Sequence, residues 1–338
     1  MRAEQPKGDE VRELEPIWRK VCTRYPEANF LQSPAWLQAN RLMGNHPVVI
    51  EAQAESWCVG IIKDARRGRY LEIPGGPLID WSTQAEEMMQ KIRAVAEREH
   101  CVFVRMRPQL RATAENRALL ERLALRKAPM HLHAEHTVMI DLAGADEAGL
   151  LAAMRKQTRY EVRRAEKLGI KVWRGNSEEL FKEFHAVQVE TAKRQNFVPP
   201  SLKVLLAERE AFQEQAQIYV ADSAEGERIC YGLILLDGAE AEYFEAASTN
   251  LGRTLPGAYS MLWHAMCELK QQGIKRFNLW GIAPAGATHH RYSGVTVFKK
   301  GFGGEVVEFM PAQDLVIKPL RYRLDYWFES LRRKCRGL

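Results

Sequence analysis

The chain has 338 residues, of which 46% are hydrophobic and 27% are charged. This composition predicts a globular protein with two domains of ordinary size or one large one, and it excludes collagen, coiled coil and disorder as the dominant state. The sequence has no run of the roughly 18 apolar residues that a membrane span needs. We therefore expect a soluble protein of the cytoplasm. The net charge of +6 suits a phosphate-bearing partner without requiring one.

Residues with metal-binding or nucleophilic chemistry do not form a recognised pattern. The six cysteines are scattered without a C-x-x-C pair, which favours reduced thiols over a zinc ribbon or a disulfide scaffold. The run H-L-H-A-E-H at 131–136 lacks the H-E-x-x-H spacing of a helical zinc site. We expect no metal centre and no covalent nucleophile.

The two halves of the chain show the same order of elements. The first half is expected to form two strands, a helix and a strand, at 57–64, 69–74, 84–99 and 101–106. The second half repeats this order at 229–236, 242–247, 258–272 and 276–282. A local C-x-G pattern recurs as well, at Cys58 with Gly60 and at Cys230 with Gly232. We interpret the chain as a duplicated α/β unit, with a flexible break near residue 145.

A cationic helix is expected directly after this break. Its inward stripe consists of Leu151, Met154, Thr158, Val162 and Ala165, and Gly169 should end it. The other face carries six basic residues between 155 and 167, against two acidic ones. Three of the arginines stand four residues apart, where like charges repel unless an anion joins them. The sequence leaves open whether this face is solvated or contacts phosphate.

The C-terminal segment predicts another helix. Pro319 should begin it, and the apolar residues expected to face inward are Leu320, Leu324, Trp327, Phe328 and Leu331. We favour a docked helix with solvated charge over a helix whose seven basic residues touch nucleic acid or an anionic membrane.

The duplicated mix of strands and helices resembles the GNAT superfamily of acyltransferases, in which the coenzyme A pyrophosphate sits on a glycine turn at a helix N-terminus. The corresponding segment here is N-L-G-R-T-L-P-G, and the third residue after Arg253 is Pro256 instead of glycine. Proline has no N–H to offer a phosphate. We therefore expect no acetyl-CoA cofactor.

Five stretches together resemble the Fem peptidyltransferases (FemABX), which use aminoacyl-tRNA to build peptidoglycan cross-bridges. They are F-L-Q-S-P-A-W (30–36), M-R-K-Q-T-R-Y-E-V-R-R-A-E-K-L-G (154–169), T-A-K-R-Q-N-F (191–197), R-F-N-L-W-G-I (276–282) and G-V-T-V-F-K-K-G-F-G-G-E (294–305). The resemblance implies α/β architecture with mixed sheets in two tandem GNAT-like acyltransferase domains. Residues 1–145 with 318–338 would form the acceptor side, and 146–317 the aminoacyl-tRNA side. It also implies a short form without the helical arm.

The resemblance implies Lys299 as the catalytic residue, because it follows the first phenylalanine of F-K-x-G-F. Aminolysis of an aminoacyl ester passes through a tetrahedral centre with a negative oxygen, which a fixed ammonium stabilises. The acceptor supplies the amine, so no enzyme nucleophile is required. Phe298 could shelter the ammonium from water. Without the motif, Lys299 and Lys300 would be interpreted as solvent lysines on opposite faces of a strand.

The same resemblance gives the substrate-binding candidates: Arg159, Tyr160, Arg163, Arg164, Arg194, Lys300, Phe298, Trp36 and Arg41. The first four lie on the basic helix, where the anions would be phosphates of a tRNA acceptor end or a diphosphate of the acceptor. Arg194 either orients substrate or caps a helix. Where some family members carry a lysine for acceptor phosphate, this chain has Asn40, with Arg41 next.

These features predict an enzyme that moves an amino acid from aminoacyl-tRNA to an amine of a peptidoglycan precursor stem peptide, forming an amide. The acceptor would be a lipid-linked or UDP-linked muropeptide, and contact with the inner membrane surface would be transient, without stable insertion. We expect no cofactor besides the aminoacyl-tRNA co-substrate. The alternatives are another amine acceptor such as a peptide natural product, an acyl-CoA N-acyltransferase, and a non-catalytic RNA-binding protein.

Overall fold

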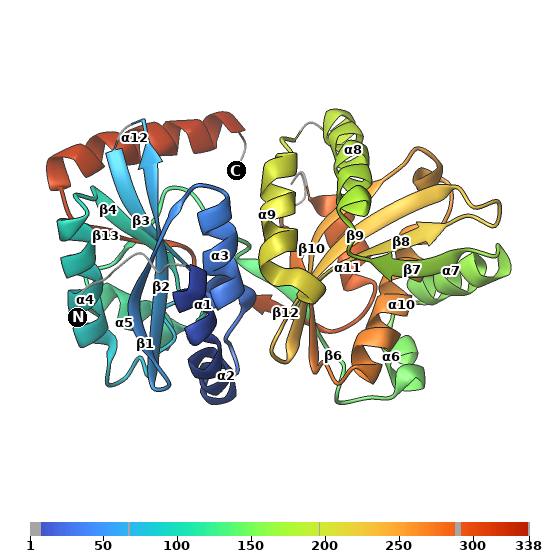
Figure 1. Cartoon of the computed structure of the whole chain (residues 1–338), viewed down its shortest axis with the longest axis horizontal. Coiled ribbons are helices and arrows are strands. Elements are labelled where there is room, and N and C mark those ends of the chain that lie inside the picture. Colours follow the sequence, from blue (N-terminus) through green and yellow to red (C-terminus); the bar gives the residue numbers. More distant parts are fainter. Residues whose placement is uncertain (1–7, 67, 196, 288–291, 337–338) are drawn as a thin grey trace. The chain divides into compact units, whose positions relative to one another are not determined.

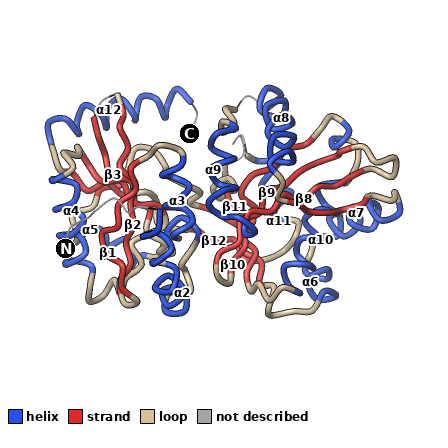
Figure 2. The backbone as a smooth tube through the Cα atoms, in the orientation of Figure 1, coloured by secondary structure: helices blue, strands red, loops and turns tan. Residues whose placement is uncertain are grey.

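The computed structural model describes residues 8–66, 68–195, 197–287 and 292–336 (Figure 1). The chain divides into two compact units, one of Met1–Glu135 with Glu308–Leu338 and one of His136–Val307. Each unit has a mixed sheet with helices on its faces (Figure 2), as the sequence predicts for a duplicated α/β chain. Within the described part of the chain, no helix is both long and apolar enough to cross a membrane.

The first unit is built on a six-stranded sheet in the order β1-β2-β3-β4-β13-β5. Its strands are β1 (His46–Gln53), β2 (Ser56–Ala65), β3 (Gly68–Pro74), β4 (Phe103–Arg107), β13 (Gln313–Val316) and β5 (Arg126–Lys127). Only β3 and β4 run parallel, and they stay paired from Leu71–Val104 to Pro74–Arg107. The connection between them is α4 (Ala85–Arg98), because parallel strands need a crossover.

The helices of the first unit cover both faces of this sheet. One face carries α4, whose methionine, isoleucine and valine side chains enter the apolar core. The remaining helices are α1 (Gly8–Glu13), α2 (Glu15–Arg24), α3 (Pro34–Leu42), α5 (Ala114–Arg122) and α12 (Pro319–Arg336). The opposite face has a second apolar cluster in which Trp18 of α2 and Leu37 of α3 meet Trp57 of β2.

The second unit is built on a seven-stranded sheet in the order β12-β6-β11-β10-β9-β8-β7. Its strands are β12 (Glu305–Glu308), β6 (His136–Asp141), β11 (Arg276–Gly281), β10 (Glu240–Ser248), β9 (Arg228–Asp237), β8 (Ala216–Asp222) and β7 (Lys171–Gly175). Here β10 and β11 form the parallel pair. The helix α10 (Gly257–Gln271) connects them and buries one side against the sheet.

The other helices of the second unit lie on opposite faces of its sheet (Figure 1). They are α6 (Glu147–Ala153), α7 (Lys156–Lys167), α8 (Glu178–Gln195), α9 (Leu202–Phe212) and α11 (Ser293–Lys300). The helix α7 packs with α10, whereas α8 and α9 pack together on the other face, over β10 and β8.

The predicted duplication is present in the order and pairing of the elements. The series β2-β3-α4-β4 in the first unit corresponds to β9-β10-α10-β11 in the second, close to the predicted ranges. The two glycines of the C-x-G pattern share a physical reason. A Cβ atom on Gly60 would lie 2.7 Å from Leu71 Cδ1, and one on Gly232 would lie 2.7 Å from Tyr243 Cε2. In both units the next strand therefore fills the space where a larger side chain would be.

The unit boundaries lie one strand earlier than the predicted ones. We expected the break near residue 145, but β6 pairs with β11 and belongs to the second sheet. We also expected the second domain to reach residue 317, whereas β13 pairs with β4 and β5 in the first sheet. Composition marks a flexible segment but does not reveal which strands pair across it.

The orientation predicted for the C-terminal helix is wrong. All five apolar residues expected to face inward, Leu320, Leu324, Trp327, Phe328 and Leu331, are exposed. The residues of α12 that face the first sheet are Tyr322, Asp325 and Glu329. The reason lies in the sheet, because the strands below α12 present the charged side chains of Arg105 and Asp314.

The five cysteines with described side chains are free, as expected for reduced thiols. Cys335 lies outside the described side chains. Burial raises the pKa of the Cys58 and Cys230 thiols, which keeps them protonated and unreactive.

Candidate active site

Lys299 is the only buried residue of α11. Its exposed fraction is 8%, whereas the neighbouring Lys300 is exposed. The alternative interpretation of both lysines as solvent residues of a strand is therefore wrong. The segment forms a helix that ends at Lys300, and Gly303 and Gly304 follow with φ of 85° and 83°. These left-handed turns lead the chain into β12.

The Lys299 ammonium lies where two parallel strands separate. The strands β10 and β11 pair only from Glu240–Arg276 to Glu242–Asn278, although both continue beyond these residues. Lys299 Nζ donates to the carbonyl oxygen of Gly281, the last residue of β11, at 2.9 Å. It also lies 5.8 Å from the ring centroid of Tyr243, on β10. In α/β proteins, ligands commonly bind at the carboxyl ends of parallel strands.

The surroundings of Lys299 are apolar. Phe298 packs with Tyr259 and Phe302, with ring centroids 5.0 Å and 5.2 Å from its own. Burial lowers the pKa of the Lys299 amine to about 7. Among the residues described, no carboxylate lies within ion-pair distance of Nζ. An unpaired buried lysine is costly for folding, which makes it a candidate for function.

Phe298 packs in an aromatic cluster with Tyr259 and Phe302, and its shelter of the Lys299 ammonium stays a prediction. Its ring is partly buried against the core of the second unit. Lys300 points to the exposed side of α11 and is not part of the buried site.

The cationic helix begins against the glycines that follow Lys299. The backbone N–H of Arg155 donates to the carbonyl oxygen of Gly301 at 2.9 Å. A Cβ atom on Gly301 would lie 2.4 Å from Thr158 Oγ1, so only glycine fits this contact without a shift. The start of α7 and the end of α11 are thus held together by backbone contacts.

The helix predicted as a single element is divided here. Met154 and Arg155 have extended backbone, with ψ of 151° and 145°, and they separate α6 from α7. The extended geometry frees the Arg155 N–H for Gly301 instead of an intrahelical bond. The inward stripe is otherwise confirmed, because Met154, Thr158, Val162 and Ala165 are buried and Leu151 is half-buried.

The outer face of α7 gathers four of the predicted binding residues. A shallow pocket of about 500 Å³ is lined by Lys156, Arg159, Tyr160, Arg163, Arg164 and Lys167. Two of the arginines are partly engaged: Arg159 donates to the carbonyl oxygens of Ala152 and Met154, and Arg164 pairs with Glu161 at 3.1 Å. Arg163 and Tyr160 are exposed. The surface is cationic and accessible, as a phosphate contact requires.

Arg194 has a structural partner inside the second unit. Its guanidinium donates to Thr191 Oγ1 at 3.0 Å and to the carbonyl oxygen of Ser248. Ser248 is the last residue of β10, so Arg194 links the end of α8 to the end of β10. These contacts are structural, but they link the helix to a strand and do not cap a helix, and a role in orienting substrate stays a prediction.

Trp36 and Arg41 belong to the first unit, on α3. Trp36 is buried and packs edge-on against Phe30, with ring centroids 5.4 Å apart, while Arg41 is exposed in the last turn. Asn40 is buried and donates to the Trp36 carbonyl oxygen at 3.0 Å. Lys63 Nζ, from β2, lies 3.5 Å from Asn40 Oδ1, so this position has a lysine next to it.

The H-L-H-A-E-H run lies in the first unit up to Glu135, and His136 begins β6 of the second unit. Burial, followed by the charges of Arg107 and Lys63, lowers the pKa of His133 to about 3, which keeps the imidazole neutral. Glu135 Oε1 accepts a hydrogen bond from the Ala312 N–H at 3.1 Å. In the described part of the protein, no group of three or more His, Cys, Asp or Glu side chains could hold a metal ion.

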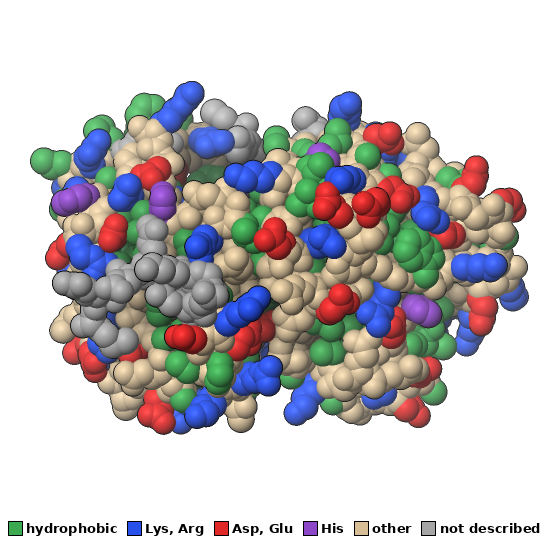
Figure 3. All heavy atoms as spheres, in the orientation of Figure 1, with side chains coloured by type: hydrophobic (Ala, Val, Ile, Leu, Met, Phe, Trp, Pro, Cys, Tyr) green, Lys and Arg blue, Asp and Glu red, His purple; other side chains and the backbone are tan. Residues whose placement is uncertain are grey.

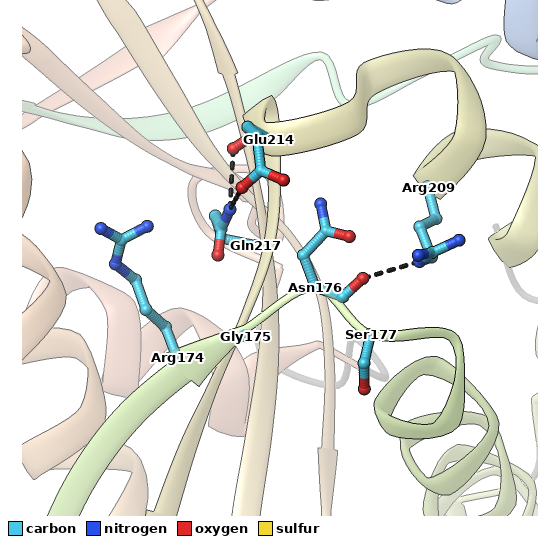
Figure 4. Close-up of a pocket in the computed structure, with 7 residues that line it drawn as sticks. All are labelled: Arg174, Gly175, Asn176, Ser177, Arg209, Glu214 and Gln217. Carbon is cyan, nitrogen blue, oxygen red and sulfur yellow. Dashed lines mark hydrogen bonds between the residues drawn. The ribbon is translucent and has the colours of Figure 1, made fainter.

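A polar pocket of about 660 Å³ lies at the end of β7 (Figure 4). Its two arginines already have partners. Arg174 pairs with Glu268 at 2.5 Å, and Arg209 Nε donates to the Asn176 carbonyl oxygen at 2.6 Å. Glu214 and Gln217, which line the same pocket, bond to each other. Because both arginines already bond within the protein, we assign this pocket no chemical role.

Sequence reasoning missed a buried carboxyl pair beside the strand opening. Gln188, on α8, donates to Glu245 Oε2 at 2.6 Å, and burial raises the Glu245 pKa to about 7. Glu208, on α9, is buried beside it, and burial and the Glu245 charge raise its pKa as well. A bulge lies between Tyr243 and Glu245. The one signal in the sequence was the spacing of Glu242 and Glu245, which breaks the period of two.

The comparisons with known proteins agree with this architecture. A model of the FemAB family matches residues 126–228 and 222–329. The aminoacyltransferase FemA of Staphylococcus epidermidis is 26% identical over 105 residues, which are 31% of this chain and 24% of that protein. The match thus spans about a quarter of the length of this curated relative.

Two solved structures share the fold. A crystal structure of FemX has a TM-score of 0.81 at 15% identity, and the match covers 96% of this chain and 99% of that chain. A tandem GNAT protein from the clavulanic acid biosynthesis pathway has a TM-score of 0.57 at 9% identity, covering 93% of this chain and 97% of that one. These likenesses confirm the predicted fold class of two tandem GNAT-like domains. Because the family model extends over more than half of the chain, this protein belongs to the FemAB family.

Proposed function

We propose that this protein is an aminoacyltransferase that moves an amino acid from aminoacyl-tRNA to an amine of a peptidoglycan precursor stem peptide. The observation that carries the proposal is Lys299, a buried amine without an ion-pair partner among the described residues, at the opening between β10 and β11. Membership of the FemAB family supports it, as does the name of the curated relative, an aminoacyltransferase.

The proposed chemistry needs little from the protein beyond position and charge. The neutral acceptor amine attacks the ester carbonyl carbon, a C–N bond forms, and the C–O bond to the tRNA ribose breaks. The attacking nitrogen gives up one proton and the departing ribose oxygen takes one up, so the products are an amide and a free ribose hydroxyl. The carbonyl oxygen is negatively charged in the intermediate, and protonated Lys299 stabilises it in a buried surrounding, where the interaction is strong. Because burial lowers the pKa of this amine to about 7, the protonated form declines as the pH rises above 7. The ester is already activated, so the transfer needs neither metal nor covalent intermediate.

The cationic face of α7 is the proposed contact for the tRNA acceptor end. Arg163, Tyr160 and Lys156 are exposed there, and an exposed tyrosine can stack on an unpaired base. The backbone contact between Arg155 and Gly301 joins this face to the end of α11. In this proposal, a donor bound on α7 would present its ester towards Lys299.

The test is transfer from charged tRNA. Purified protein is incubated with tRNA carrying each amino acid and with a lipid-linked or UDP-linked muropeptide, and the product is followed by mass spectrometry. Pre-treatment with ribonuclease should abolish the product. Product that forms after ribonuclease treatment, or only when acetyl-CoA is added, would refute the tRNA donor.

The role of Lys299 has a matched control in an exposed lysine of the same unit. Lys299→Met should lose at least about 100-fold in kcat/KM, in the range found when one oxyanion-stabilising group is removed. Lys171→Met removes the same charge from an exposed position on β7 and should stay within about twofold of the wild type. Equal activity of the two variants, with both folded by circular dichroism, would remove Lys299 from the mechanism.

A further inference from the structure

The C-terminal helix α12 is attached to the first sheet through polar side chains. Arg105, on β4, forms two hydrogen bonds with the carboxylate of Asp314, on β13, both at 2.8 Å. The Tyr322 hydroxyl donates to Asp314 Oδ2 at 3.0 Å, and Glu329 pairs with Arg105 at 2.8 Å. Tyr322 also packs on Phe103, with ring centroids 5.6 Å apart. These contacts fix which side of α12 faces the sheet.

The opposite side of α12 carries the large apolar residues. Leu320 is 80% exposed and Trp327 is 58% exposed, and the same stripe includes Leu324, Phe328 and Leu331. At about 100° of rotation per residue, these five positions fall within an arc of about 100° that lies opposite Tyr322 and Glu329. Soluble proteins rarely expose a contiguous apolar patch larger than a few hundred Å² without a function for it.

Arginines border this apolar stripe on both sides. The same helical projection places Arg321 and Arg332 along one edge and Arg323 along the other, and all three are exposed. In the space-filling view, hydrophobic and basic side chains stand together along the upper left edge, where Figure 1 places α12 (Figure 3). The helix thus has three faces: a docked polar one, an outward apolar one, and cationic borders between them.

We propose that the outer face of α12 docks on the surface of a membrane that contains anionic lipids. A helix that lies in the plane of a membrane places leucine, tryptophan and phenylalanine at the boundary of the acyl chains and the headgroups. Arginines beside that stripe then reach anionic headgroups. The apolar centre with cationic edges complements such a surface. A nucleic acid would leave five large apolar side chains without a partner, which makes it the weaker match.

This interaction is independent of the chemistry at Lys299, because it rests on the first unit alone. It concerns attachment to the surface, since no described helix is suited to cross a membrane. The anchoring contacts leave the outer face available: Tyr322 and Glu329 hold the helix while Leu324 and Trp327 point away from the sheet.

Sedimentation of the full-length protein with lipid vesicles tests the proposal. The vesicles are phosphatidylcholine alone and phosphatidylcholine mixed with phosphatidylglycerol. We expect binding to the mixed vesicles, weaker binding to phosphatidylcholine alone, and a decrease with added salt. The double substitution Leu324→Gln with Trp327→Gln should lower the partition coefficient by about tenfold or more, because both apolar side chains leave the interface.

Two control variants match these changes. Val198→Gln alters an apolar residue that is 93% exposed but lies in the second unit, and it should bind as the wild type does. Arg321→Gln with Arg332→Gln should weaken binding to the anionic vesicles. Arg122→Gln with Arg126→Gln removes the same charge from exposed positions of the first unit outside α12 and should not. Thermal unfolding checks that every variant is folded.

Three results would overturn the proposal. The first is an absence of binding to either kind of vesicle. The second is equal binding by the wild type and the Leu324→Gln, Trp327→Gln variant. The third is a dimer in light scattering that this variant abolishes while vesicles do not bind, which would assign the stripe to a second copy of the chain. Equal binding to both vesicle types, without salt dependence, would refute the role of the arginines.

Discussion

Replacing Lys299 with methionine should stabilise the protein against unfolding while it removes the proposed activity. The lysine is buried, and its ammonium donates a hydrogen bond to the Gly281 carbonyl oxygen. Burial lowers the pKa of its amine from 10.5 to about 7. The unfolded chain therefore binds the proton more tightly than the folded chain, and this difference opposes folding. Methionine has a similar length and no charge to desolvate.

The size of the effect follows from the linkage between proton binding and folding. Below pH 7 both states are protonated, and the pKa difference costs on the order of 4 kcal/mol. Between about pH 7 and pH 10.5 only the unfolded state holds the proton, so the wild type regains stability as the pH rises, and by about pH 10 the cost is below about 1 kcal/mol. Losing the hydrogen bond to Gly281 subtracts about 1 kcal/mol from the gain. The net stabilisation by Lys299→Met is therefore about 3 kcal/mol near pH 6 and close to zero near pH 10.

Thermal unfolding of the wild type and Lys299→Met at these two pH values measures the difference. For a unit of this size, about 3 kcal/mol corresponds to a rise in Tm of about 6–12 °C at the lower pH. Lys300→Met, at the exposed neighbouring position, should change the stability by less than about 0.5 kcal/mol at both pH values. If Lys299→Met is less stable than the wild type at about pH 6, or if its effect does not depend on pH, the burial cost inferred for this amine is wrong.

Three further substitutions test other parts of the structure. Gly304→Ala should lower the free energy of unfolding, measured by urea denaturation, by about 1–3 kcal/mol. The reason is that φ at this position is 83° and the new Cβ would lie 2.5 Å from the Met139 carbonyl oxygen. An unchanged urea midpoint would contradict this close contact. Asp314→Asn should cost about 3 kcal/mol in thermal unfolding, since it weakens the buried pair with Arg105, and a neutral result would mean that Arg105 finds other partners. Glu245 has a pKa of about 7 in the folded protein, above its value in the unfolded chain, so its contribution to stability is lost as the pH rises through 7. Glu245→Gln should therefore be more stable than the wild type above pH 7 but not near pH 5. The same stability difference at both pH values would contradict the raised pKa.

The elements that the sequence predicted well are those whose signal is local. The strands and helices of the two repeats have clear periodicity and end at glycines such as Gly273, which has φ of 83°. The C-x-G pattern was predictive because a glycine in the middle of a strand marks a close approach from a neighbour. Leu71 in the first unit and Tyr243 in the second supply that approach.

The predictions that failed depend on partners far away in the sequence. The apolar stripe of α12 was evident, but periodicity does not tell which face docks. Arg105 and Asp314 decide it, and they come from β4 and β13, which are 209 positions apart. The helix α11 was equally hard to predict from the sequence. Its V-T-V-F segment has the β-branched residues typical of a strand, so only tertiary contacts favour a helix there.

The candidate site could be predicted in its residues but not in its geometry. The F-K-x-G-F motif indicated Lys299, whereas its burial depends on how β10 and β11 separate and on Tyr243 beside them. The carboxyl pair of Glu208 and Glu245 gave no comparable signal. It forms because a bulge turns Glu245 towards α8 and α9, and a bulge is not encoded by composition.

The parallel strands differ between the two copies of the repeat. In the first unit β3 and β4 remain bonded to their ends at Pro74 and Arg107, while in the second unit β10 and β11 part after Glu242 and Asn278. Because β3 and β4 are hydrogen-bonded to their ends, an acyl ester cannot enter between them. The two units therefore differ at this pair of strands: the pair is bonded to its end in the first unit and separates in the second, where the proposed function places the ester. We expect substitutions between β3 and β4 to lower the stability of the fold, and substitutions where β10 and β11 separate to lower the turnover of the proposed reaction.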